Sequence, residues 1–272
     1  MSVSGITITS ILDPHAAGRL VRFYLERMRL HSLLLASLLC TSALAQSPAP
    51  EKIVPGDVRV DGSFIRSATN AWKMTGTSPG GRRTDGGIWK DRIEVLDRNG
   101  KAIVRRTQAD SGPEGTTTFV TETDRQSLTP IRAEVTTPSG MHRVLTFERD
   151  HVHVALTTPA RSEEKDIPIA QPVFDFNGGL FGLLVDGFPL KEGFSAAFPI
   201  FDPRSGVAWA RYTVVGRERV ASGKGRKTDV WTVEVQDPVR VTRMLFSLTK
   251  EPPYVIRLQE IGDGVFWTFD MM

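Results

Sequence analysis

The fold of this chain is decided by the stretch Ile93-Glu94-Val95-Leu96-Asp97-Arg98-Asn99-Gly100-Lys101-Ala102-Ile103-Val104-Arg105. Two short runs rich in apolar and β-branched residues flank the dipeptide Asn99-Gly100. This dipeptide favours a tight β-hairpin, because both residues of such a turn must tolerate a positive φ angle. The stretch therefore predicts two antiparallel strands joined by a two-residue turn.

The same pattern recurs along the chain. Residues 141–147 follow the turn Ser139-Gly140, and Asp263-Gly264 turns the alternating segment 254–259 into residues 265–269. Further runs of β-branched and aromatic residues cover 207–215, 226–236 and 239–248. We therefore predict a mainly β fold built on one antiparallel sheet.

Residues 172–190 depart from this two-residue rhythm. Large apolar residues recur there at intervals of three and four, which is typical of a helix, and we expect one over residues 173–186. Gly178, Gly179 and Gly182 each lower its intrinsic stability by about 1 kcal/mol relative to Ala. The helix therefore depends on packing against the sheet, as a lid would. The charged run 161–166 before it is expected to be a solvated loop.

The N-terminal segment has the pattern of an export signal. Arg29 precedes the apolar run 33–39, and Ala43 and Ala45 occupy the positions that a signal peptidase recognises. This run is much shorter than the roughly 20 apolar residues that cross a bilayer, so we expect no membrane span. Cys40 follows a leucine where a lipoprotein signal requires a small residue, so we expect cleavage without lipidation.

The expected organisation has three parts. Residues 1–45 are an N-terminal extension and cleaved signal peptide, with translation starting at Met28; residues 46–55 are a spacer; residues 56–272 are a single β-barrel-like domain. Export would place the mature protein in the periplasm. Cleavage removes four of the 34 basic and two of the 31 acidic residues, which leaves a net charge of about +1 and no cysteine. Such a chain has no disulfide, no thiol nucleophile and no electrostatic case for a nucleic-acid partner.

No segment carries a convincing catalytic motif. His151 and His153 share one face of a predicted strand and could hold a metal ion with His142, but the apolar residues between them face the other way, which favours surface histidines. Asp175 and Asp186 lie in the expected helix, where burial would perturb their pKa values, and roles at the helix ends are the simpler interpretation. We expect neither a metal nor another cofactor.

A succession of strand and turn signatures runs through residues 170–261. Its members are Phe174-Asp175, Gly187-Phe188-Pro189-Leu190 with Gly193, Val215-Gly216-Arg217-Glu218-Arg219-Val220, Trp231-Thr232-Val233-Glu234-Val235, Leu245-Phe246-Ser247 and Glu251-Pro252-Pro253-Tyr254-Val255-Ile256-Arg257. In this succession the chain resembles an uncharacterised family of bacterial periplasmic β-proteins, which is similar in turn to the outer-membrane lipoprotein carrier proteins. The resemblance implies an antiparallel half-open β-barrel with a short helical lid in a Gram-negative envelope, and it implies no catalytic residues.

A curved sheet with an apolar concave side is a place where proteins hold hydrophobic ligands. The first hypothesis is therefore a non-enzymatic periplasmic binding or carrier protein for a lipid, an acylated molecule or another apolar ligand. The candidate lining residues are Phe174, Leu180, Phe181, Leu184, Trp209, Trp231, Phe246 and Trp267. The alternative for each of them is a place in a closed core.

Two other classes of function stay open. An envelope structural or assembly protein would bind another protein through sheet edges or loops, and it would expose a large apolar patch outside the barrel mouth. A hydrolase built on two carboxylates is the third class, and the sequence locates no such pair.

We expect the mature protein to begin at Gln46 and to carry no covalent lipid, because Ala43 and Ala45 define the cleavage site. N-terminal sequencing and intact-mass measurement of the exported protein test this. An acylated Cys40 at the N terminus would contradict it.

Overall fold

The computed structural model describes residues 50–112, 114–175, 180–221, 227–239, 242–262 and 264–272, and these belong to one compact unit. Its strands are β1 (Glu51–Lys52), β2 (Ala68–Thr77), β3 (Arg83–Arg98), β4 (Lys101–Gly112), β5 (Gly115–Asp124), β6 (Pro130–Thr136), β7 (His142–Phe147), β8 (His151–Thr157), β9 (Ser162–Pro168), β10 (Ser195–Asp202), β11 (Gly206–Ala221), β12 (Lys227–Asp237), β13 (Thr242–Leu248), β14 (Val255–Gly262) and β15 (Val265–Met271). The described helix is α2 (Phe181–Asp186). The expected leader over 1–45 lies outside the described residues, as does the start of the spacer.

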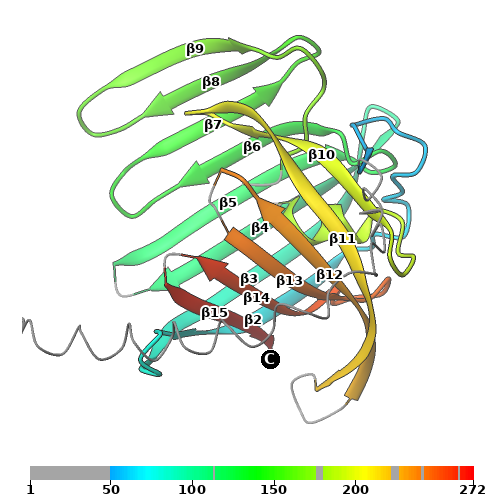
Figure 1. The fold of residues 1–272 in the computed structure, drawn as a ribbon. Helices are drawn as coiled ribbons and strands as arrows, with labels where there is room; N and C mark the ends of the chain where they lie inside the picture. Colours follow the sequence, from blue (N-terminus) through cyan, green and yellow to red (C-terminus); the bar gives the residue numbers. More distant parts are fainter. Residues whose placement is uncertain (1–49, 113, 176–179, 222–226, 240–241, 263) are drawn as a thin grey trace, which may run out of the picture. The chain divides into compact units, whose positions relative to one another are not determined.

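All the described strands belong to one sheet in the order β1-β10-β11-β12-β13-β14-β15-β2-β3-β4-β5-β6-β7-β8-β9. Among the described strands, β1 pairs with β10 in parallel and every other pairing is antiparallel. The sheet curls, so that β10 to β13 pass in front of β4 to β6 in Figure 1. Because β1 and β9 remain its two edges, the sheet does not close. The fold is a mainly β, half-open barrel, as the sequence predicts.

The hairpin signals hold in the structure. Asn99 and Gly100 have φ angles of 55° and 78°, and they join β3 to β4 with Arg98 opposite Lys101. Gly264 has a φ angle of 73° in the β14–β15 turn, whose other turn residue, Asp263, lies outside the described residues. Register in a hairpin follows from its turn, so these positions fix which side chains meet across the sheet.

The concave side of the curled sheet holds the main core. Its buried members come from β10 to β14 on one side and from β2, β3 and β4 on the other, with α2 and residues 53–65 between them. Leu183, Leu184 and Val185 of α2 are completely buried. A methyl group on Gly182 would lie 2.3 Å from Val255 Cγ2. The helix therefore approaches β14 at a distance that only glycine allows.

The helix is shorter than the sequence predicts. It covers Phe181–Asp186, whereas Val173–Asp175 are extended: Phe174 forms a parallel bridge with Ile200 of β10. The other expected residues, 176–179, lie outside the described part. The extended start has a physical reason, because the Phe174 side chain packs edge-on against Phe188 and Phe198, with ring centroids 5.6 and 6.3 Å apart.

A buried ion pair holds the start of this helix. Arg106 and Asp91 make two parallel hydrogen bonds of 2.9 and 3.0 Å, and their side chains are 4% and 1% exposed. Arg106 Nη1 also donates to the carbonyl of Leu180 at 3.1 Å. The pair therefore ties α2 to β3 and β4.

The charged run 161–166 is mostly a strand rather than the expected loop. Residues from Ser162 to Pro168 form β9, which pairs with β8 and is an edge of the sheet. Its side chains are almost all exposed, so the sequence shows no apolar face. Charges on an edge strand oppose pairing with another chain.

Replacing Gly182 by Ala should destabilise the protein by about 1–3 kcal/mol, because the new methyl group overpacks the contact with Val255. This loss outweighs the gain in helix propensity of about 1 kcal/mol. Urea unfolding measures the difference. Gly112→Ala is the matched control, because its methyl group enters open space. Wild-type stability for Gly182→Ala would mean that α2 does not pack this closely on β14.

Candidate ligand-binding surface

Four aromatic residues share the concave face of the half-open barrel. They are Trp89 of β3, Phe119 of β5, and Trp267 and Phe269 of β15, and all four are partly exposed. Strand alternation places Trp89 on the same face as the core residue Ile93. Trp89 and Phe269 also pack against the main core. We call these four residues the aromatic surface.

The rings of the aromatic surface contact one another across strands. Trp89 and Phe119 stack with their centroids 5.7 Å apart and their planes 13° apart, although β4 runs between their strands. Phe269 meets Trp89 edge-on at 5.9 Å. Such pairs gain about 0.5–1.5 kcal/mol beyond the area they bury. The surface is therefore held in place without a ligand.

Two glycines make room for the fourth ring. Methyl groups on Gly76 of β2 and Gly86 of β3 would lie 3.0 and 2.6 Å from the Trp267 indole. The indole therefore covers backbone that has no side chains, and it extends the aromatic surface from β15 over β2 to β3. Side chains at these two positions would displace it.

Two carboxylates adjoin the aromatic surface. Glu260 of β14 is directly opposite Trp267 and has an interaction partner of its own. Asp110 of β4 is directly opposite Trp89 in the hairpin register, and β-strand partners of this kind have Cβ atoms about 5 Å apart. Burial raises the pKa of the Asp110 carboxyl above its ordinary value. No described side chain forms an ion pair with this carboxyl, and no described group donates a hydrogen bond to it. The surface therefore combines four aromatic rings with an unpaired, partly desolvated acid.

Several polar groups deeper on the same face are paired, whereas Arg143 of β7 has a buried Nε without a hydrogen bond from the described residues. Arg106 pairs with Asp91, and Thr121 Oγ1 donates to Asp175 at 2.9 Å. Asp175 therefore binds β5, and the residues that follow it, 176–179, lie outside the described part. These groups form a buried polar layer between the aromatic surface and the main core, and they leave Asp110 as the acid nearest to the opening on β4.

The structure separates the residues that the sequence proposes as lining. Phe174, Leu180, Leu184 and Phe246 are completely buried and belong to the main core. Their burial matches the closed-core alternative for these four positions. Trp267, in contrast, belongs to the aromatic surface.

The remaining three proposed residues lie elsewhere. Trp209 is on the opposite face of β11 from the core residue Tyr212, and Lys52 Nζ lies 4.8 Å from its ring centroid. Trp231 packs partly against the core beneath the Arg217 guanidinium, 4.1 Å from its ring centroid. Phe181 begins α2, and its side chain lies outside the described part of the structure.

Sequence reasoning missed Trp89, Phe119, Phe269 and Asp110. The sequence does contain information that places three of these residues. Counting back from the Asn99-Gly100 turn pairs Trp89 with Asp110, and alternation along β15 places Phe269 on the face of Trp267. Counting residues from the turn does not show which part of this face other strands leave exposed.

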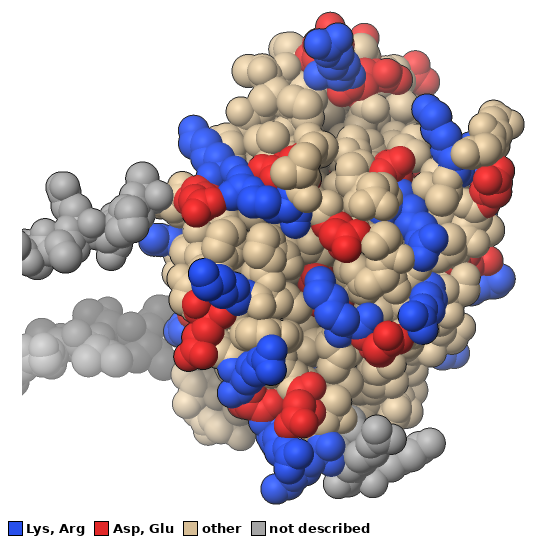
Figure 2. Space-filling model, turned by 90° about the vertical axis from the view of Figure 1, so that its right-hand side faces the viewer, with Lys and Arg blue, Asp and Glu red and all other residues tan. Residues whose placement is uncertain are grey.

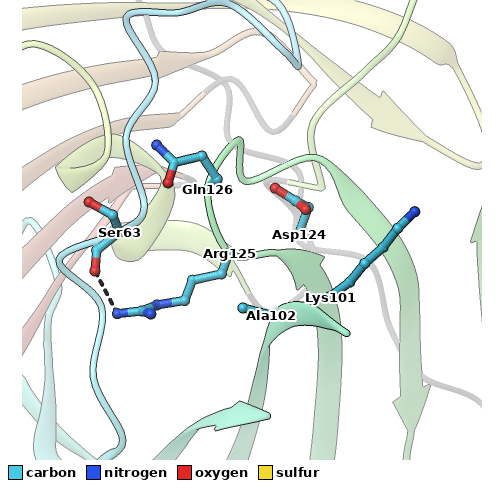
Figure 3. Close-up of a pocket in the computed structure, with 6 residues that line it drawn as sticks. All are labelled: Ser63, Lys101, Ala102, Asp124, Arg125 and Gln126. Atoms are coloured by element: carbon cyan, nitrogen blue, oxygen red, sulfur yellow. Dashed lines mark hydrogen bonds between the residues drawn. The ribbon is translucent and has the colours of Figure 1, made fainter. Parts of the chain in front are cut away.

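A hollow of about 300 Å³ lies on another part of the unit, beside the turn between β5 and β6. Figure 3 shows the residues around it. It is lined by Ser63, Lys101, Ala102, Asp124, Arg125 and Gln126. The Arg125 guanidinium is engaged with the carbonyls of Ser63 and Ile65 at 2.6 and 2.9 Å, and Asp124 accepts from Ser127. These two charged groups therefore serve the turn and are not available for a ligand.

The histidines of β7 and β8 contact acids. His151 Nδ1 is 2.8 Å from Asp150, and His153 Nδ1 is 2.7 Å from Asp166. His142 is at the far end of the β7–β8 ladder from His151. Within the described ranges, no group of three or more histidine, cysteine or acidic side chains is placed to hold a metal ion.

A second unusual acid lies at the end of α2. Asp186 is completely buried, and no described residue hydrogen-bonds to either of its carboxylate oxygens. Burial raises its pKa to about 8, while the nearby Lys250 ammonium, 3.7 Å away, opposes the shift. Lys250 also donates to the main-chain carbonyl of Asp186 and lies over the Phe64 ring at 4.3 Å. The pair therefore packs at the margin of the core, apart from the aromatic surface.

Charge on the surface is mixed. Figure 2 shows Lys and Arg side chains interspersed with Asp and Glu over one face, and neither sign gathers into a patch there. That face lacks the concentrated positive field that a polyanion needs. Of the helices in the described ranges, none has both the length and the apolar character that crossing a bilayer requires.

These features define a half-open antiparallel barrel with a helix inside and an aromatic surface on its concave face. A family model described as a protein of unknown function, DUF3108, matches residues 73–269. The chain belongs to this family, since the match spans well over half of its length. No curated protein and no solved structure matches the chain.

The buried acid predicts a pH dependence of stability. The pKa of Asp186 in the folded protein, about 8, is above its ordinary value of 3.8, so the folded state binds the proton more tightly. The associated stability is complete below about pH 4 and declines as the pH rises towards 8. Between about pH 6 and 8 the free energy of unfolding should fall by up to about 3 kcal/mol. Urea unfolding at several pH values measures this.

Asp186→Asn should remove most of this decline, because its side chain cannot ionise. The exposed Asp229→Asn is the control and should keep it. Equal pH profiles for the wild type and Asp186→Asn would show that Lys250 keeps the carboxylate charged throughout this range.

Proposed function

We propose that this protein is a non-enzymatic binding or carrier protein for a lipid or another apolar ligand, and that it acts in the periplasm. The observation that carries the proposal is the aromatic surface. Trp89, Phe119, Trp267 and Phe269 remain partly exposed on the concave face of an unclosed sheet. Large aromatic residues that are exposed together in a concavity favour ligand binding over a purely structural role.

The energetics support an apolar ligand. Each Å² of apolar surface that leaves water contributes about 25 cal/mol, and aromatic side chains offer the largest such areas. The rings hold one another in place before a ligand arrives, so binding orders few side chains. A rigid, partly exposed aromatic surface suits an acyl chain or a similar group.

Two sequence features support the location and the class. The segment 28–45 has the pattern of a cleaved export signal. The strand and turn signatures over 170–261 resemble proteins that are similar to lipoprotein carriers. Two of the buried charged groups near the aromatic surface serve structural contacts, Arg106 with Asp91 and Asp175 with Thr121, which supports binding rather than catalysis.

Titration with the neutral fluorescent probe N-phenyl-1-naphthylamine tests the proposal. The wild type should bind it, and the double variant Trp89→Ala, Phe269→Ala should bind at least about tenfold more weakly, because it loses two contact surfaces. Trp209→Ala is the matched control, since this tryptophan is on the opposite face of its strand, and it should bind as the wild type does.

Native mass spectrometry of the protein from its own cells, followed by organic extraction, should show a co-purifying apolar molecule. The proposal fails if the wild type neither retains such a molecule nor binds the probe. It also fails if the double variant, shown to be folded by circular dichroism, binds the probe as tightly as the wild type.

A further inference from the structure

Asp110 adds an acidic group to the aromatic surface. Its carboxyl is on the concave face of β4, because alternation from the buried residues Arg106 and Gln108 places every second residue on that side. It is partly desolvated and has no partner among the described residues. A carboxylate in such a place is best stabilised by a cation that a ligand brings.

Among the described residues, no cation is placed to serve this carboxyl. The basic residue that shares its face of β4 is Arg106, four residues away, or roughly 13 Å along the strand. That guanidinium is engaged with Asp91 and with the carbonyl of Leu180. The charge of Asp110 is therefore uncompensated by its own strand.

The neighbouring rings are also suited to a cation. Trp89 is directly opposite Asp110, and Phe119, from the strand on the other side of β4, stacks against Trp89. Cations are attracted to the faces of aromatic rings within about 6 Å, and quaternary ammonium groups are recognised in this way. Elsewhere in the same molecule the Arg217 guanidinium lies 4.1 Å from the Trp231 ring centroid, so the pairing already occurs in this protein.

The rest of the aromatic surface suits an apolar chain. Phe269 and Trp267 continue it along β15, away from Asp110 and across two glycines. One carboxylate is too few for a divalent metal ion, which takes several oxygen ligands. A small amine without an apolar chain would not contact Phe269 and Trp267.

We propose that the aromatic surface and Asp110 together bind a single amphiphile with an alkylammonium head, with the head between Asp110 and the Trp89 ring and the chain over Phe269 and Trp267. This inference rests on the proposed function and names the ligand class for the same site. It excludes anionic amphiphiles such as free fatty acids as preferred ligands, because their head would meet a carboxylate of the same charge.

Isothermal titration calorimetry with three surfactants of equal chain length tests it. These are dodecyltrimethylammonium, the neutral dodecyl maltoside and dodecyl sulfate, each below its critical micelle concentration. The wild type should bind the cationic surfactant at least about tenfold more tightly than the neutral one, and the anionic one most weakly. Butyltrimethylammonium should bind at least about tenfold more weakly than its dodecyl relative.

Variants at position 110 assign the preference. Asp110→Asn should bind the cationic surfactant about tenfold more weakly and the neutral one within about a factor of two of the wild type. Asp110→Glu should keep the preference, because it keeps the charge. Asp229→Asn, which removes an exposed acid elsewhere, is the control and should behave as the wild type. Unfolding midpoints of all variants establish that they are folded.

The outcomes separate this inference from the proposed function. Equal binding of the three surfactants, or an unchanged preference in Asp110→Asn, overturns the alkylammonium head while leaving an apolar site. Equal binding of the butyl and dodecyl compounds would show that the chain adds nothing to binding, and this result overturns the proposal that the ligand is an amphiphile. Failure of all the dodecyl compounds to bind overturns the proposed function together with the inference.

Discussion

The buried pair of Arg106 and Asp91 is the interaction on which the interior of this protein depends. It is in the middle of the concave face, and its third hydrogen bond reaches the carbonyl of Leu180 at the start of α2. Removing one partner of such a pair leaves a buried charge and typically costs about 3–5 kcal/mol. A short helix with little stability of its own thereby gains a defined position against the sheet.

This polar layer divides the concave face into two regions with different physical roles. On one side, α2 and the strands β10 to β14 enclose residues such as Phe174 and Leu184 completely. On the other side, the sheet is not covered in the same way, and Trp89 and Phe269 stay partly exposed. The half-open topology thus gives one face both a closed core, which stabilises the fold, and an aromatic surface, which stays accessible to a ligand.

The sequence predicts the sheet well because local rules decide it. Asn99-Gly100 specifies its turn, and hairpin counting follows from that turn. Local rules do not predict where α2 begins, because a long-range bridge to Ile200 holds Phe174 in an extended conformation. Strand β9 was missed because an exposed edge strand has no apolar alternation. For the lining, the sequence identifies large apolar side chains, but whether Leu184 is enclosed while Trp89 is open depends on which distant strands cross over each of them.

The contact of Trp267 with Gly76 and Gly86 has an evolutionary consequence. The three residues come from three neighbouring strands, yet the indole occupies the volume that side chains at positions 76 and 86 would fill. Selection therefore acts on them as one unit. A lineage that replaced Trp267 with a small residue would be released from both glycines, and a lineage that acquired a side chain at either glycine would have to reposition its tryptophan.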